Sequence, residues 1–124
     1  MKEIIAIIRM NKLAQTKRAL VEAGFNGLTA LKVMGRGKFL RELELISDAQ
    51  AENRDMLLES LLKGGRLIPK RLLTIVVVDA DVTKVVDTII VANKDGKMGD
   101  GKIFVVPVTE VVRVRTAERG DAAI

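Results

Sequence analysis

The sequence contains no cysteine and no histidine among its 124 residues. Without them the chain cannot form disulfides, thiol nucleophiles or imidazole bases, and it lacks the most common side-chain ligands of transition metals. Any catalysis would therefore have to depend on carboxylates, lysines or a bound cofactor.

Aromatic residues are also scarce, because tryptophan and tyrosine are absent and only three phenylalanines remain. These are Phe25, Phe39 and Phe104. The net charge of +5 would suit a polyanion such as nucleic acid, but few rings are available to stack on bases. A compact pocket for a small anion explains the positive charge better than an RNA-binding surface, and we expect no nucleic-acid partner.

Long hydrophobic runs are missing as well, since no segment approaches the roughly 18 uninterrupted apolar residues of a transmembrane helix. The apolar stretch at residues 4–8 is too short for the hydrophobic region of a signal peptide, and no small-residue cleavage site follows it. We therefore expect a cytoplasmic protein with no membrane insertion. The length favours one domain that spans residues 1–124.

What the sequence does contain is an alternation of strand and helix patterns. Apolar runs rich in β-branched residues predict strands at residues 3–9, 28–36, 72–78 and 102–108. Apolar side chains at helical spacing predict one helix that follows Asn11 and stops at Gly24, and a second helix at residues 82–90. The segment Asp79-Ala-Asp81 offers an N-cap for the second helix.

The two halves of the chain repeat this order, so that each half contains a strand, a helix and a strand. The repeat predicts an α+β fold, the ferredoxin-like βαββαβ sandwich, with a four-stranded antiparallel sheet and both helices on one face. The other face of the sheet would expose apolar side chains unless another subunit covers it. We therefore expect an oligomer.

A long insertion at residues 39–69 separates the two halves. Connections of this length inside a compact domain are usually functional. Ser47 and Gln50 have the spacing of a capping box, and leucines then recur at helical spacing, which predicts a helix near residues 48–63. The apolar face of this helix could pack on the core or bind a partner protein, and its place in a long loop favours the partner.

Residues 94–102 combine three glycines with three lysines. Glycines at positive φ let backbone N–H groups converge on an anion while lysines add charge, which suits a di- or triphosphate. The spacing is not that of a Walker A motif, and a flexible connection kept soluble by lysines is the alternative. Gly35-Arg-Gly-Lys38 is a second candidate phosphate loop.

The tail of the chain offers another pair of cations. Residues 111–116 alternate in character, which predicts a short extended segment with Arg113 and Arg115 on one side. Two guanidinium groups at this spacing can hold phosphate oxygens. The alternative is that both arginines extend into solvent.

Several motifs together resemble the PII signal-transduction family over nearly the whole chain. They are Gly35-Arg-Gly-Lys38, Asp87-Thr-Ile-Ile90, Gly96-Lys-Met-Gly-Asp-Gly-Lys-Ile-Phe104, Val112-Arg-Val-Arg-Thr116 and Asp121-Ala-Ala-Ile124. The resemblance implies a cytoplasmic homotrimer that binds ATP or ADP competitively in clefts between subunits and senses 2-oxoglutarate together with Mg²⁺ and ATP. It also implies a single PII-like domain with a long effector and target loop at about residues 37–70, a tail at about 109–124, and target contacts through residues 38–66.

The resemblance assigns roles to particular residues of this sequence. Those matched to nucleotide binding are Thr29, Gly35, Gly37, Lys38, Val76, Gly99, Asp100, Gly101, Lys102, Arg113 and Arg115. Those matched to the effector 2-oxoglutarate are Arg9, Gly37 and Lys70. No side chain is matched to the metal, because Phe39 stands where the family usually has a magnesium-ligating glutamine. The absence of tyrosine excludes regulation by tyrosine modification.

Three segments are similar to the nitrogenase-associated branch of the family: Met1-Lys-Glu-Ile-Ile-Ala-Ile-Ile-Arg9, Gly35-Arg-Gly-Lys38 and Leu67-Ile-Pro-Lys-Arg-Leu-Leu-Thr74. This similarity implies a non-catalytic regulator of nitrogenase, which acts with a second PII-like subunit. The long loop also fits a PII protein that regulates an ammonium transporter or a metabolic enzyme.

Two functions of other classes remain as alternatives. One is an RNA-binding ferredoxin-like domain, which the fold and the basic charge allow and the missing aromatics oppose. The other is an enzyme in which Asp87, Asp100 and Glu110 position a magnesium ion and a water for slow ATP hydrolysis, although no base or nucleophile supports turnover.

Overall fold

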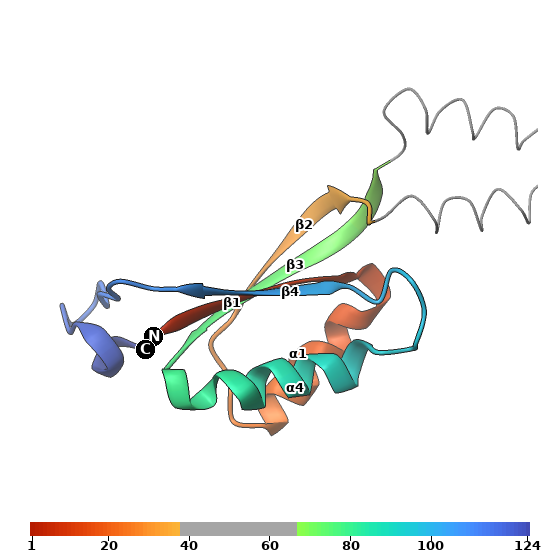
Figure 1. Cartoon of the computed structure of the whole chain (residues 1–124). Coiled ribbons are helices and arrows are strands. Elements are labelled where there is room, and N and C mark those ends of the chain that lie inside the picture. The colour runs from red at the N-terminus through yellow and green to blue at the C-terminus, as the bar shows by residue number, and fades with distance from the viewer. Residues whose placement is uncertain (38–66) are drawn as a thin grey trace, which may run out of the picture.

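The computed structural model describes residues 1–37 and 67–124 and is shown in Figure 1. Its strands and helices are β1 (Lys2–Arg9), α1 (Leu13–Glu22), β2 (Thr29–Gly35), β3 (Ile68–Val77), α4 (Val82–Asn93) and β4 (Lys102–Pro107). Short 3-10 turns occur at Met10–Lys12, Asp79–Asp81 and Gly120–Ala123. The predicted helix near residues 48–63, together with Lys38 and Phe39, lies outside the described residues.

The four strands form one antiparallel sheet in the order β2-β3-β1-β4. Both helices lie on the same face of this sheet (Figure 1). The predicted ferredoxin-like α+β sandwich is therefore confirmed. Each βαβ half leaves its two strands separated by a strand of the other half, so the sheet joins the two halves.

The core lies between the sheet and the two helices. Alternate side chains of β1 and β3 face the helices because successive residues of a strand point to opposite faces. The buried set from the two strands is Ile4, Ala6, Ile8, Leu73, Ile75 and Val77, and the helices contribute Leu20, Val85 and Ile89. Burying each large aliphatic side chain of this kind contributes about 1.5–3 kcal/mol to stability.

The opposite face of the sheet is open in the single chain. Strand register places Leu31 beside Leu72 and Ile5 beside Phe104 on this face. Leu31 is 54% exposed and Phe104 is 44% exposed. An exposed apolar sheet face is the feature that we expected to be covered by another subunit.

Strand β3 begins earlier than the sequence pattern indicates. Residues 68–70, which we placed at the end of the long loop, belong to the sheet because Lys70 pairs with both Arg9 and Val33. Pro69 is tolerated within the strand because β1 ends opposite Lys70, so no ladder partner is lost on that side. The strand therefore extends beyond the sandwich together with β2 (Figure 1).

The end of α1 follows the sequence prediction. Gly24 has φ +98° and donates its N–H to Val21 O at 3.0 Å, while the Phe25 N–H donates to Leu20 O at 2.8 Å. This pair of bonds is a Schellman motif, in which a residue at positive φ satisfies the last carbonyls of the helix. Gly24 is thus the helix stop that the pattern predicted.

The N-cap of the second helix lies in the predicted segment, at Asp81, but its side chain does not cap the helix. Asp79–Asp81 form a 3-10 turn, and no side-chain capping bond is formed at Asp81 within the described residues. The Asp79 carboxylate instead accepts a hydrogen bond of 2.9 Å from the N-terminal amine of Met1. That hydrogen bond, with the nearby charge of Lys2, lowers the pKa of Asp79 below its ordinary value. The start of β1 pairs with the end of β3, which places the N-terminal amine within hydrogen-bond distance of the Asp79 carboxylate.

Candidate functional site

The glycine loop, residues 95–101, connects α4 to β4. Gly96, Gly99 and Gly101 have φ values of +75°, +91° and +122°, as the sequence predicted for a loop that needs residues without Cβ. At Gly101 the space is also closed, because a Cβ there would lie 2.4 Å from the carbonyl oxygen of Ile7. The loop is therefore pressed against β1 at its last residue.

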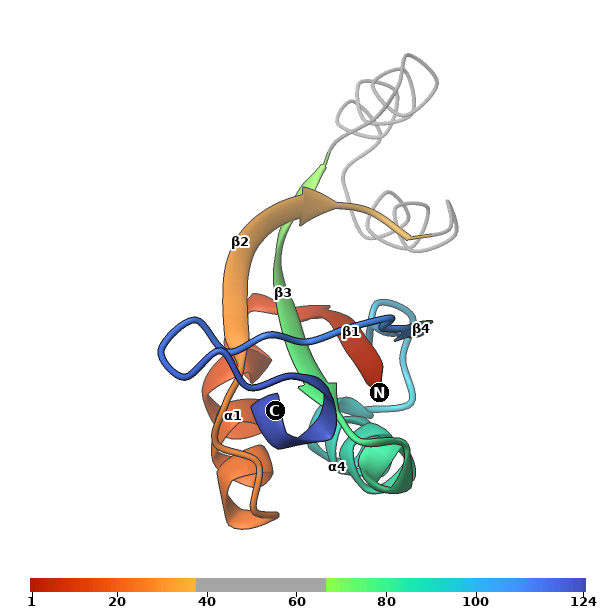
Figure 2. The ribbon, with the colours of Figure 1, turned by 90° about the vertical axis from the view of Figure 1, so that its left-hand side faces the viewer.

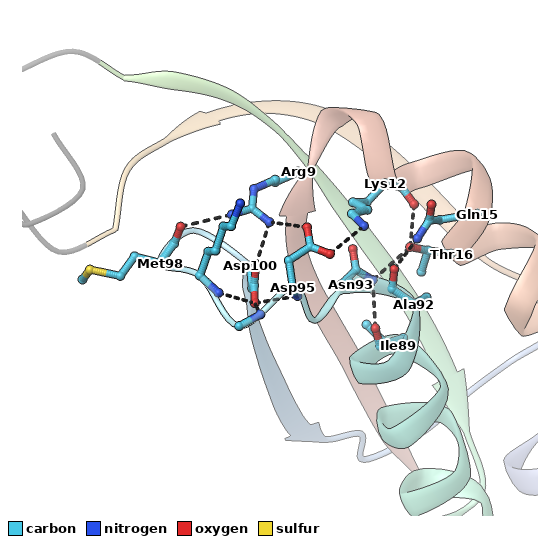
Figure 3. Close-up of polar contacts among 12 residues, drawn as sticks. Arg9, Lys12, Gln15, Thr16, Ile89, Ala92, Asn93, Asp95, Met98 and Asp100 are labelled. Carbon is cyan, nitrogen blue, oxygen red and sulfur yellow. Dashed lines mark hydrogen bonds and ion pairs between the residues drawn. The ribbon is translucent and has the colours of Figure 1, made fainter. Parts of the chain in front are cut away.

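One carboxylate oxygen of Asp100 organises the loop from inside. Asp100 Oδ2 accepts hydrogen bonds from the backbone N–H groups of Asp95, Gly96 and Lys97, at 2.9, 2.9 and 3.2 Å. We expected the converging N–H groups of this loop to face a ligand anion. Three of them instead surround the chain's own carboxylate, so this part of the expectation is corrected (Figure 3).

The other oxygen of Asp100 is held by Arg9. Arg9 Nη1 lies 2.7 Å from Asp100 Oδ1 and 3.3 Å from Asp95 Oδ2, and Nη2 donates to Met98 O at 3.1 Å. Lys12 Nζ pairs with the remaining oxygen of Asp95 at 3.1 Å. Two cations from the end of β1 and the following turn therefore neutralise both carboxylates of the loop (Figure 3).

These contacts set the charge state of Asp100. Desolvation by burial raises its pKa, but the hydrogen bonds from Arg9 and from the three loop amides outweigh that effect and lower the pKa to about 2. The carboxylate is therefore ionised at every physiological pH. Arg9 keeps only 16% of its side chain exposed, so the pair is partly shielded from water.

A buried polar contact fixes the end of α4, where the loop begins. Asn93 Nδ2 donates to Thr16 Oγ1 at 2.9 Å and to Ile89 O at 2.8 Å, and the Thr16 hydroxyl donates to Lys12 O at 2.7 Å. Asn93 Oδ1 has no hydrogen-bond partner among the described residues. The sequence analysis missed this contact, although a threonine within the apolar stripe of α1 was a signal of a buried hydrogen-bond partner.

Arg9 and Lys70, the cations matched to the effector, lie at the same end of the sheet as the glycine loop. Arg9 lies opposite Lys70 on β3, and Lys102 lies opposite Ile7. Lys70 is buried. Gly35 is the last residue of β2 at this same end, where it pairs with Ile68, and Gly37 follows it.

Two nucleotide candidates lie farther along the sheet. Thr29 pairs with Thr74, and Val76 pairs with Glu3. The Thr74 hydroxyl donates to Glu3 Oε2 at 2.8 Å, which places a polar contact on the open face. Val76 also lines a hollow of about 480 Å³ whose other walls include Phe25, Gly27, Val111, Asp121 and Ile124.

The tail arginines lie at the other end of the molecule. Strand β4 starts beside the glycine loop with Lys102 and ends at Pro107, and the tail follows (Figure 1). Lys102 and the tail arginines are therefore not brought together within one chain. A phosphate site that uses both needs a second copy of the chain.

The tail is not the extended segment that the alternation predicted. A bridge between Val112 and Arg119 closes it into a tight loop, in which the Ala117 N–H donates to Arg113 O at 2.8 Å (Figure 2). The Arg113 guanidinium donates to Glu118 Oε1 at 2.9 Å and to Ala122 O at 3.0 Å. Arg113 is thus held by the tail itself, whereas Arg115 is exposed in the turn.

The acidic residues considered for ATP hydrolysis do not converge. Asp87 lies on α4, Asp100 is enclosed by its loop, and Glu110 accepts N–H bonds from Val111 and Gly120. In residues 1–37 and 67–124 no group of three acidic side chains could hold a metal ion. The same part of the chain contains no helix long and apolar enough to cross a membrane.

Comparisons with known proteins give a consistent result. The family model described as nitrogen regulatory protein P-II matches residues 1–118. The nitrogen fixation nifHD region glnB-like protein 2 of Methanococcus maripaludis is 46% identical over 126 residues, which cover all of both chains. Nitrogen regulatory protein P-II of Klebsiella oxytoca is 42% identical over 124 residues, again covering all of both. Among solved structures, Arabidopsis thaliana PII bound to citrate matches with a TM-score of 0.73 and 33% identity, over 99% of this chain and 91% of that one.

Proposed function

The chain belongs to the nitrogen regulatory protein P-II family, in its nitrogen-fixation branch, and from this premise we propose a nucleotide-gated signalling role for it. Proteins of this family are non-catalytic regulators. In our proposal the chain forms a homotrimer in the cytoplasm, binds ATP or ADP between subunits, and reports nitrogen status by contact with a target protein.

One observation carries the proposal of an intersubunit site. Lys102 is an exposed cation at the start of β4 and Arg115 is an exposed cation in the tail beyond the far end of β4, so we infer that two copies of the chain bring them to one phosphate chain. The open apolar face of the sheet supplies a surface on which copies can assemble. A closed ring of copies would then complete one site at each subunit boundary.

Within each site we propose that the phosphates contact the part of the glycine loop that Asp100 does not occupy. Gly99, Gly101 and Lys102 lie beyond the amides that the Asp100 carboxylate holds, and Lys102 contributes charge. Arg115 approaches from the neighbouring copy, and Arg113 joins it if its bond to Glu118 exchanges. The other proposed nucleotide contacts are Thr29, Gly35, Gly37, Lys38 and Val76.

We propose that 2-oxoglutarate binds with Mg²⁺ and ATP near Gly37 and Lys70. Lys70 supplies a positive charge beside Arg9 at the base of the long loop, which suits a dicarboxylate. The Arabidopsis neighbour was crystallised with citrate, another small carboxylate. Since Phe39 provides no oxygen ligand, water would complete the coordination of magnesium, which retains waters readily.

The target is proposed from the names of the relatives. Several of them belong to nifHD regions, which supports nitrogenase as the target of residues 38–66, with a second PII-like subunit in the complex. An ammonium transporter or a metabolic enzyme is the alternative target. A nucleic-acid partner is not proposed, because Phe104 is the only aromatic residue on the described part of the open sheet face.

Calorimetric titration of the purified protein with ATP, and then with 2-oxoglutarate at saturating ATP and magnesium, tests the ligand proposal. Pull-down from cells grown with and without ammonium tests the target. A protein that bound RNA across a range of salt concentrations but did not bind ATP would contradict the proposal.

A further inference from the structure

Arg9 lies between the two proposed sites. It is the last residue of β1 and the cross-strand neighbour of Lys70, and the resemblance matched both residues to the effector. Its guanidinium, however, is turned toward the glycine loop, where it makes the three contacts with Asp100, Asp95 and Met98 described above (Figure 3). Arg9 therefore contacts the first residue of the loop, Asp95, and two residues near its end, Met98 and Asp100.

Asp100 links the Arg9 side chain to the backbone of the loop. One of its oxygens meets Arg9, and the other meets the N–H groups of Asp95, Gly96 and Lys97. A loop with glycines at three positive-φ positions has little conformational restraint of its own. The order of the loop therefore depends on Asp100, and the orientation of Asp100 depends on Arg9.

The same pair removes an electrostatic obstacle to phosphate. A free carboxylate at residue 100 would repel a phosphate bound to the neighbouring Gly99, Gly101 and Lys102. Arg9 faces Asp100 and Asp95 at 2.7 and 3.3 Å, and Lys12 supplies a second cation at 3.1 Å from Asp95. The lysines at both ends and in the middle of the loop are thus exposed, while its two carboxylates are paired with Arg9 and Lys12.

We infer that Arg9 is a positioning residue of the nucleotide loop, which acts on the phosphate site through Asp100 rather than by contact with the nucleotide. This inference rests on the proposed function, in which the loop binds phosphate. The physical reason is preorganisation, because a loop that is already ordered does not lose conformational entropy when the ligand binds.

The test is a double-mutant cycle with Arg9→Gln, Asp100→Ala and the double variant. ATP affinity is measured by calorimetry on the full chain, with Arg18→Gln as the control, since Arg18 is an exposed arginine on α1 and its loss changes the net charge equally. We expect each single variant to weaken ATP binding by about tenfold, the scale of a lost charge-assisted hydrogen bond. The double variant should bind no more weakly than Asp100→Ala, because both changes break the same link.

Amide hydrogen exchange of the nucleotide-free protein supplies an independent measurement. The N–H groups of Gly96 and Lys97 should exchange faster in Arg9→Gln and Asp100→Ala than in the wild type, and Arg18→Gln should leave them unchanged. This measurement remains decisive if the wild type fails to bind ATP, a result that would overturn the proposed function rather than the anchoring of the loop.

Three results would overturn the inference. Losses of ATP affinity that add in the double variant would mean that Arg9 contacts the nucleotide itself. Normal ATP affinity in Arg9→Gln with weakened 2-oxoglutarate binding would make Arg9 an effector ligand. Unchanged exchange at Gly96 and Lys97 in Arg9→Gln would show that Arg9 does not hold the loop.

Discussion

Gly101 crosses Ile7 so closely that a Cβ on Gly101 would lie 2.4 Å from the carbonyl oxygen of Ile7. The contact fixes the point at which the glycine loop enters the sheet, because the next residue, Lys102, pairs with Ile7. Any side chain at residue 101 must move either the loop or strand β1, and both are parts of the proposed phosphate site.

Gly101→Ala should therefore destabilise the protein more than Gly96→Ala. Both glycines have positive φ, but nothing lies within 4 Å of a Cβ at Gly96. We expect about 1–2 kcal/mol for the left-handed backbone in either variant and a further 1–3 kcal/mol at Gly101 for the displaced backbone. Urea unfolding at one fixed protomer concentration measures the difference. Equal losses would show that β1 yields to the added methyl group at no cost.

Lys102→Ala and Arg115→Ala should each weaken ATP binding by about 1.5–3 kcal/mol, the range for hydrogen bonds to charged groups. Lys17→Ala serves as the control, because Lys17 is an exposed cation on α1. Calorimetry with ATP compares the three variants with the wild type. If Arg115→Ala binds ATP as the wild type does, the tail is not part of the site.

Light scattering at micromolar concentration should give the mass of an oligomer. From the resemblance to the family we expect a trimer. Phe104→Asp should reduce this mass, because it places an unpaired charge on the open sheet face beside Ile5. Val91→Asp is the matched control, since Val91 is 82% exposed on α4 and away from that face. A monomeric wild type, or an equal effect of both variants, would contradict assembly through the sheet.

Phe39→Gln should tighten 2-oxoglutarate binding by about 1.4–2.7 kcal/mol, the equivalent of restoring one oriented ligand to a metal site. The prediction comes from the sequence resemblance, since residue 39 lies outside the described residues. Titrations of both proteins at saturating ATP and magnesium make the comparison. An unchanged affinity would mean that residue 39 is not near the metal.

The carboxyl group of Asp100 should titrate with a midpoint near 2 in a carbon NMR experiment, against an ordinary value of 3.8. Because the folded-state pKa lies below the unfolded one, the group stabilises the fold fully above about pH 4 and loses this contribution as the pH falls toward 2. Arg9→Gln should raise the midpoint. A midpoint near 3.8 in the wild type would contradict the contacts of this carboxylate.

Much of the fold could be predicted from local sequence patterns. The apolar, β-branched run of β1 and the helical period of α4 identified both elements to within a few residues, and Gly24 marked a helix end because its backbone conformation is a local property. The failures were at charged residues. The segment Asp79-Ala-Asp81 was expected to supply a capping side chain, and the tail arginines were expected in an extended segment, since sequence spacing does not reveal which distant charge a side chain will meet.

The sequence alone determined the order of strands and helices, the open apolar face and the positive-φ glycines, because periodicity and glycine act over a few neighbouring residues. The tertiary structure alone decided that Arg9 meets Asp100, 91 positions away, and that Thr16 meets Asn93, 77 positions away. Such pairs depend on strand register and helix packing, which bring distant backbone segments within hydrogen-bond distance. For the same reason, three amides of the predicted anion loop bind the chain's own carboxylate, since Asp100 lies on that loop and reaches them first.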